Sequence, residues 1–434
     1  MIKLIFKNLW ARRRRNAWVL IELILITIVA WVVLDPAIVS GYYFSLDSGY
    51  DVDRLVTLDL LEIPEGGRGY DEASAETRMD DVHRLLDKVR SNQQVETATI
   101  TSFQIFESGS LNVSSFPKDS ADGCYVVVKF FPNTDFFKTF GIKGLDGNVF
   151  NEPPVSGNDI IISRSVGDIM HPGINPLGHY LNEGTDSTAK HFDWDRNKLI
   201  AGVTDEAIYR SYMGRSPIIY KYDKERKVKY AGDLKIVIRL KPGVNPDRFI
   251  VDYSPVVNSE LKAGNVYAHS PMTFEDRRDS TARETRNKYV ISLALALFFF
   301  VNLCLGIIGT FYLQTRTRSR DTGVMRSFGA TPSYVLREIM SEGWIMTTLA
   351  WIIGCGLYCI YAKKHGLYEA EGVFWGHSDT IISVLPQWCD FFWSHFWVVS
   401  GIIYVALIIT VSIGIYIPAR RISRTNPVDA LKDE

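Results

Sequence analysis

The sequence predicts a membrane protein with four transmembrane α-helices and a large α+β extracytoplasmic domain. Four apolar runs long enough to cross a bilayer as helices lie at residues 17–34, 289–313, 343–362 and 391–417. Between the first two runs, residues 35–288 contain no such run and have the composition of a water-soluble mixed domain. A chain of 434 residues has room for both parts.

The first sixteen residues (1–16) predict an amphipathic helix that lies in the membrane interface. The apolar side chains that share one helical face are Ile2, Ile5, Phe6, Leu9 and Trp10. The basic side chains before the first span, with no acid among them, are Lys3, Lys7 and Arg12–Arg15. A basic cluster directly before a span indicates a cytoplasmic N-terminus, and we prefer this interpretation to nucleic-acid binding.

The first apolar run also has the charge order of a secretory signal. Asp35-Pro36 follows it and lacks a small-x-small cleavage site, so we expect a retained span. Glu22 is the only Asp, Glu, Lys or Arg in the four runs. It lies near the basic end of its helix, and we interpret it as an interfacial or arginine-paired residue rather than a transport residue.

The domain at 35–288 combines short strands with occasional helices, which is typical of an α+β fold. Short apolar stretches, several with alternating polar residues, predict strands at 55–60, 95–103, 124–131, 160–163, 199–203, 218–222 and 234–240. Apolar residues at helical spacing predict a clear helix at 78–90 and a weaker one at 246–257. The polar stretch 275–288 contains no Gly or Pro. We expect a helical stalk that continues the second span outward, with a plain linker as the alternative.

Residues 314–342 form a basic segment between the second and third spans, which the positive-inside rule assigns to the cytoplasm. Its arginines are Arg316, Arg318, Arg320, Arg326 and Arg337. Val324, Met325 and Phe328 fall at helical spacing and give a short apolar stripe between these charges.

A turn and a second helix follow this stripe. Gly329 tolerates a positive φ and can end the first helix. Thr331 then offers an N-cap, and Pro332 suits the first helical position. The segment therefore predicts helix, tight turn and helix at the inner membrane face, where a cytoplasmic partner can push on it.

The remaining segments complete the topology. Residues 363–390 form an outer loop with more acid than base and many aromatic side chains, which suit a membrane interface. The tail at 418–434 carries Arg420, Arg421 and Arg424 and is therefore expected in the cytoplasm. Both termini are then cytoplasmic and the large domain lies outside.

The sequence contains no pattern that indicates catalysis. It has no G-x-x-x-x-G-K-[ST] phosphate loop, no G-x-S-x-G nucleophile elbow and no histidine spacing typical of a metal site. Three of the five cysteines lie in apolar runs, so no disulfide framework is expected. We expect no catalytic, cofactor-binding or metal residues in this chain.

The segment at 314–342 resembles the cytoplasmic coupling segment of FtsX-like ABC-transporter permeases. The matching positions and the stripe beside them are Asp321, Gly323, Val324, Met325, Arg326, Phe328, Gly329, Ala330, Thr331 and Glu342-Gly343. The family more often has Glu-Ile-Gly where this chain has Asp321-Thr322-Gly323. The resemblance implies that these residues dock on an ATPase.

The outer domain resembles that of macrolide-exporter (MacB-type) permeases. The resemblance is carried by residues 133–150, 159–165, 175–180, 199–205, 216–220 and 234–243, and by the closing Pro-Ala-Arg-Arg of the tail. It implies two lobes: a porter-like lobe built from the two ends of the domain, and a second lobe inserted at about 120–221.

This resemblance implies a type VII ABC permease of the bacterial inner membrane, without a fused ATPase. ATP and Mg²⁺ are expected in a separate ATPase dimer. A second permease subunit, either the same chain or a related one, is expected as a partner, and membrane lipid surrounds both. A periplasmic adaptor and an outer-membrane channel are further partners that the resemblance allows. Mechanotransmission for export from the periplasm is the favoured function. The alternatives are lipoprotein release, control of cell-wall hydrolases, and a membrane-anchored binding or signalling protein with no ATPase.

Overall fold

The computed structural model divides the chain into a helical unit and a sheet-rich unit. It describes residues 13–118, 121–131, 134–154, 159–181, 198–215, 217–222, 230–316, 319–368 and 387–424. Most of the predicted interfacial helix at 1–16, much of the outer loop at 363–390 and the end of the tail lie outside these ranges.

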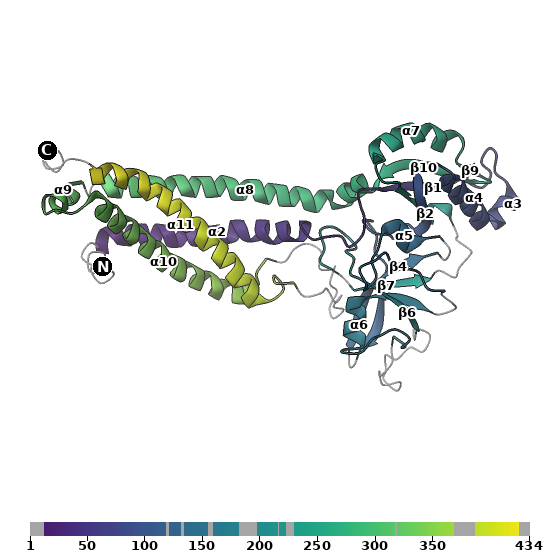
Figure 1. Ribbon diagram of the computed structural model, residues 1–434, viewed down its shortest axis with the longest axis horizontal. Helices are drawn as coiled ribbons and strands as arrows, with labels where there is room; N and C mark the ends of the chain where they lie inside the picture. The colour runs from purple at the N-terminus through teal and green to yellow at the C-terminus, as the bar shows by residue number, and fades with distance from the viewer. Residues whose placement is uncertain are drawn as a thin grey trace. The chain divides into compact units, whose positions relative to one another are not determined.

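Within the described ranges, four helices are long and apolar enough to cross a membrane, as the four apolar runs predict (Figure 1). They are α2 (Arg13–Phe44), α8 (Phe274–Arg316), α10 (Pro332–His365) and α11 (Phe392–Arg424). Their most apolar windows have mean hydropathies from 1.7 to 2.6. The predicted fold class of four spans with a large α+β domain is confirmed.

The core of the helical unit is formed mainly by α2, α10 and α11. Trp31 of α2 is fully buried, and its ring stacks on Tyr358 of α10 at 4.6 Å and on Phe396 of α11 at 5.3 Å. Gly343 permits the close approach of α10 and α11, since a Cβ there would overlap Ile415. In α8 only 12% of the most apolar window is buried, against 33–44% in the other three spans.

Two of these helices extend beyond the predicted spans. Helix α2 continues past Leu34 and through Pro36 to Phe44, because the apolar side chains after Pro36 pack against neighbouring elements and Asp35 is held by a partner described below. Helix α8 begins at Phe274 and includes the whole predicted stalk, so the helical interpretation of 275–288 is confirmed. Thr273 caps its start by accepting a hydrogen bond from the Asp276 N–H at 3.0 Å.

The sheet-rich unit contains one ten-stranded sheet in the order β6-β5-β7-β4-β2-β8-β1-β10-β9, with β3 paired to β4. Its strands are β1 (Leu55–Glu62), β2 (Val95–Ser102), β3 (Val113–Lys118), β4 (Ala121–Phe130), β5 (Ile160–Ser163), β6 (Ile200–Thr204), β7 (Ile218–Tyr222), β8 (Leu234–Leu240), β9 (Lys262–Ala263) and β10 (Val266–Thr273). Most pairs are antiparallel, whereas β4–β7 and β5–β6 are parallel.

One half of the sheet is built from the two ends of the domain. Strands β1 and β2 flank β8, with β10 on the outer side of β1, and the connections run through α4 (Arg78–Arg90) and α7 (Pro246–Ser259) (Figure 1). This is a split βαβ arrangement. Both helices contribute to one apolar core with these strands, for example through Leu85 of α4 and Phe249 of α7.

The other half contains the strands β3–β7, which lie between β2 and β8 in the sequence. The short helices α5 (Phe136–Phe140) and α6 (Arg164–Met170) belong to this insertion. The two halves meet at one strand pairing, where Thr101 of β2 lies opposite Phe130 of β4. Because the sheet is continuous, the division into a porter-like lobe and an inserted lobe stays a prediction.

Candidate coupling site

The basic segment between α8 and α10 folds as helix, turn and helix. Helix α9 (Ser319–Ser327) ends in a turn closed by two backbone hydrogen bonds, from the Ala330 N–H to the Met325 carbonyl at 3.1 Å and from the Gly329 N–H to the Arg326 carbonyl at 3.0 Å. Gly329 has a φ of +93°, as the sequence predicts. The pattern is the Schellman motif, in which a left-handed glycine satisfies the last carbonyls of a helix.

The second helix starts immediately after this turn. Thr331 is the N-cap of α10, and its hydroxyl accepts a hydrogen bond from the Tyr334 N–H at 3.3 Å. Pro332 occupies the first helical turn, where its missing N–H costs nothing. Helix α10 then runs without interruption into the third predicted span.

The predicted apolar stripe lies on the surface of the helical unit. The exposed fractions are 88% for Phe328, 42% for Val324 and 37% for Met325. A phenylalanine this exposed next to a rigid turn leaves apolar area that a protein partner can cover. The side chain of Arg326 is half-buried beside the stripe.

The other predicted coupling residues face inward. Gly323 is buried and Ala330 packs partly against the core of the helical unit. Glu342 is only 5% exposed and lies one turn beyond Glu338, which is 6% exposed. The structure therefore brings the stripe and the turn together at the surface and places Glu342 inside the unit, while it describes the backbone of Asp321 within α9 and not its side chain.

Glu22 contacts α8. The Thr310 hydroxyl donates to the Glu22 carboxylate, at 3.2 Å from either oxygen. Gly306, one turn earlier on α8, leaves space beside the same carboxylate. Glu22 thus joins α2 to α8 through a hydrogen bond; the side chains of the N-terminal arginines are outside the described part of the chain.

A second acidic residue in α2 was assigned to the wrong environment by the sequence analysis. Asp35, interpreted as the first residue outside the span, is 1% exposed within the continued helix. Its Oδ1 lies 2.6 Å from His395 Nε2 of α11, and its Oδ2 accepts from the Tyr368 N–H at 3.3 Å. The apolar residues after Pro36 were the signal that the helix continues.

Comparison with known proteins identifies the C-terminal part of the chain. Residues 292–427 match the family described as FtsX-like permease C-terminal. This range contains the end of α8, the coupling segment, α10 and α11.

Curated relatives extend the similarity into the outer domain. A macrolide export ATP-binding/permease protein, MacB, from Campylobacter fetus is 24% identical over 307 residues, which cover 68% of this chain and 42% of the relative. A pyoverdine export ATP-binding/permease protein, PvdT, from Pseudomonas putida is 22% identical over 310 residues, covering 70% of this chain and 42% of the relative. The chain thus spans about two-fifths of the length of these relatives.

Among solved structures, the periplasmic region of MacB from Actinobacillus actinomycetemcomitans overlaps 54% of this chain and 94% of that chain, with 13% identity and a TM-score of 0.29. That score is too low to support an argument about the fold. The sequence comparisons instead carry the assignment: residues 292–427 match the FtsX-like permease family, and the chain is similar to the MacB and PvdT ABC export proteins over about 70% of its length.

Proposed function

We propose that this chain is the membrane subunit of an ABC transporter and couples ATP hydrolysis by a separate cytoplasmic ATPase to movement of its extracytoplasmic domain. The exposed stripe of Val324, Met325 and Phe328 beside the Gly329 turn carries the proposal. An ATPase that covers this stripe would act on the first turn of α10, and α10 continues into a span.

The polar groups of the described spans favour transmission of motion over a route for polar cargo. Glu22 is bonded to Thr310, and Asp35 is enclosed by His395 and Tyr368, so both carboxylates already join helices to their neighbours. A transport route is expected to present such groups to a water-filled cavity. The MacB and PvdT names describe export, and export from the periplasm is the function that we propose here.

The proposed assembly contains two permease subunits and two ATPase subunits, and lipid surrounds it in a bacterial inner membrane. Both termini of the permease chain lie on the cytoplasmic side of that membrane. Support for the second permease comes from α8, which buries the smallest share of its apolar window and leaves the rest for lipid or another subunit. A periplasmic adaptor and an outer-membrane channel would complete an export path. Catalysis is assigned to the ATPase and none to this chain.

The test is charge insertion in the stripe. Phe328→Asp places a carboxylate in the proposed contact, where burial without a partner is unfavourable, so co-purification with the ATPase and stimulation of its activity should both fall at least tenfold. Phe328→Leu keeps an apolar side chain and should retain most of both. Phe103→Asp, which alters another exposed phenylalanine in the sheet-rich domain, controls for added charge. Full stimulation by Phe328→Asp would overturn the proposal.

A further inference from the structure

The sheet-rich unit contains a cleft of about 410 Å³ that the coupling function does not use. It is lined by residues from separate segments: Asp47, Gly49, Tyr50, Asp51, Gly141, Lys143, Val149, Asp205, Glu206, Arg215 and Arg239. A volume in this range suits a small molecule. The lining is dominated by charged side chains, so the ligand is expected to be polar.

Backbone hydrogen bonds fix the walls of this cleft. The Ile208 N–H donates to the Ser48 carbonyl at 2.8 Å, and the Asp205 N–H donates to the Lys143 carbonyl at 2.7 Å. Gly49 has a φ of +75°, and a Cβ on it would overlap the Glu206 carbonyl oxygen. The segments that carry the charged groups are therefore held together before any ligand arrives, which lowers the entropic cost of binding.

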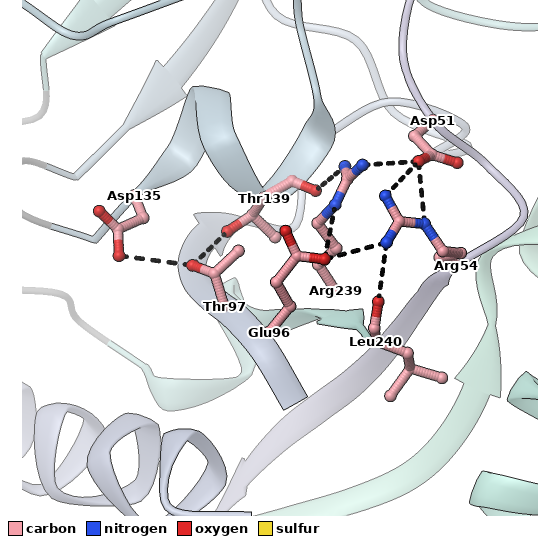
Figure 2. Close-up of polar contacts among 8 residues, drawn as sticks. All are labelled: Asp51, Arg54, Glu96, Thr97, Asp135, Thr139, Arg239 and Leu240. Carbon is pink, nitrogen blue, oxygen red and sulfur yellow. Dashed lines mark hydrogen bonds and ion pairs between the residues drawn. The ribbon is translucent and has the colours of Figure 1, made fainter. Parts of the chain in front are cut away.

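An ion-pair network forms one end of the cleft (Figure 2). Asp51 Oδ2 lies 2.7 Å from Arg239 Nη2 and 3.1 Å from Arg54 Nη2. Glu96 bridges the same two arginines, at 2.9 Å from Arg54 Nη1 and 3.6 Å from Arg239 Nε. Arg239 also donates to the Thr139 carbonyl at 3.2 Å, so its charge and its donors are largely committed within the protein.

The acidic side chains of the cleft are likewise engaged. Asp205 pairs with Arg164 at 3.4 Å, and Asp47 accepts a long hydrogen bond from the Gly49 N–H at 3.4 Å. Glu206 accepts from the Ser165 N–H at 2.6 Å and from the Ser165 hydroxyl at 3.0 Å. Burial raises the pKa of Glu206 above its ordinary value, against the hydrogen bonds from Ser165.

Two cationic side chains of the cleft differ from these. Neither Lys143 nor Arg215 makes a side-chain hydrogen bond or ion pair within 4 Å among the residues that the structure describes, and both lie beside the Asp205–Glu206 segment. The charge of Arg215 acts on Glu206 and lowers the pKa of that carboxyl, but no hydrogen bond joins the two. Lys143 is exposed and Arg215 is half-buried, so among the described residues their donors are open to an added acceptor.

We propose that this cleft binds a small-molecule anion, whose carboxylate or phosphate group is held by Lys143 and Arg215. The inference goes beyond the proposed function, since binding needs neither ATP nor an ATPase, and its failure would leave the coupling proposal unaffected. Charge-assisted hydrogen bonds from two cations to one oxyanion are the interaction that a carboxylate or phosphate accepts best. The Asp51 network then serves as a rigid wall.

The experiment is calorimetric titration of the full-length chain in detergent at low ionic strength, with pyrophosphate and citrate as probes and spermidine as the cationic comparison. We expect at least one anion to bind and spermidine not to bind; which anion binds decides between phosphate and carboxylate ligands. Lys143→Gln and Arg215→Gln should each weaken binding at least tenfold, whereas Lys143→Arg should retain it.

Lys241→Gln is the matched control, because it removes an equally exposed lysine charge that does not line the cleft. Lys143 is exposed, so its variants test the proposal even if Arg215→Gln fails to fold. Unchanged affinity in Lys143→Gln, equal weakening in Lys241→Gln, binding of neither anion, or binding of spermidine in their place would each overturn the proposal.

Discussion

His395 Nε2 lies 2.6 Å from Asp35 Oδ1, and each of the two residues is 1% exposed. The other imidazole nitrogen, Nδ1, lies 3.0 Å from the Cys389 carbonyl oxygen, which can only accept. Nδ1 therefore donates to this carbonyl, and Nε2 faces the Asp35 carboxyl. This polar group ties α2 to the start of α11 at a separation of 360 residues.

Breaking this pair should destabilise the helical unit. His395→Ala leaves the Asp35 carboxylate buried with one backbone donor, and loss of one partner of a buried pair costs about 3–5 kcal/mol. Asp35→Asn keeps an acceptor for the imidazole and should cost less than His395→Ala. Thermal unfolding of the purified chain in detergent measures both, and equal melting temperatures for His395→Ala and the unaltered chain would contradict the expectation.

Substitution at Gly329 should act through backbone strain alone. A Cβ there meets nothing within 4 Å, but φ is +93°. A left-handed conformation costs an L-residue about 1–2 kcal/mol, least for Asn and most for β-branched residues. Stimulation of the ATPase should therefore be highest in the unaltered chain. It should then decrease from Gly329→Asn to Gly329→Ala and be lowest in Gly329→Val. A valine variant as active as the asparagine variant would show that the turn does not need this geometry.

Glu22→Gln should keep most of the activity, because a glutamine oxygen can still accept the hydrogen bond from Thr310. Glu22→Ala, which removes the acceptor, should have the larger effect. The measurement is ATP-driven function of the reconstituted complex. An inactive Glu22→Gln complex with normal assembly would instead favour a proton or substrate route through the spans.

Glu107 should make the stability of the sheet-rich unit depend on pH. Burial raises the pKa of Glu107 from 4.5 to about 7, against the opposing charge of Arg278 and the N–H of Ser211. Between these values the folded state holds a proton that the unfolded state has lost, so the free energy of unfolding falls as pH rises from about 4.5 to about 7.

The contribution of Glu107 is roughly 3 kcal/mol across that window. Burial also raises the pKa of Glu152 to about 7, so the comparison must be between variants. In urea unfolding at pH 5 and pH 8, Glu107→Gln should lose less stability than the unaltered chain on going to pH 8. Glu152→Gln should also lose less stability than the unaltered chain, because burial and the charge of Asp135 raise the pKa of that carboxyl, so it is a second test of the same effect. Identical losses in Glu107→Gln and the unaltered chain would exclude the effect.

Membrane orientation can be tested at two exposed positions of described elements. Ser259→Cys, in α7, should react with a membrane-impermeant maleimide added outside intact cells, whereas Ser327→Cys, in α9, should react only after the membrane is opened. Each variant is compared with the unaltered chain, which has five native cysteines. Labelling of Ser327→Cys from outside would reverse the proposed topology.

Local patterns predicted the elements that depend on local physics. The apolar spacing of α4 and the apolar runs of β5, β7 and β8 predicted the observed residues, because α4 faces one core and these short strands are buried on both faces. Strand β10 was missed, since its sequence VYAHSPMT breaks the alternation. Its pairing with β1 shifts register near His269, and Ser270 has a φ of +47°, so an irregular ladder replaces the simple pattern.

The residues of the candidate sites likewise divide into those set by local sequence and those set by long-range packing. The Gly329 turn and its Thr331 cap involve neighbours in sequence, and both were predicted. The contact of Asp35 with His395 and the shared cleft of Lys143 and Arg215 arise only when distant segments pack. No spacing in a single sequence encodes such long-range contacts, which is why the sequence analysis described Asp35 as lying outside the span and did not find the cleft.

The connection between β2 and β8 determines where this domain can vary in length. Ser102 at the end of β2 lies opposite Leu234 at the start of β8, and the Phe103 N–H donates to the Asp233 carbonyl at 2.8 Å. The segment between them thus leaves and re-enters at adjacent points, like a long loop on a hairpin. A segment of another length could therefore replace this one without interrupting the β2–β8 ladder or the core beneath α4 and α7.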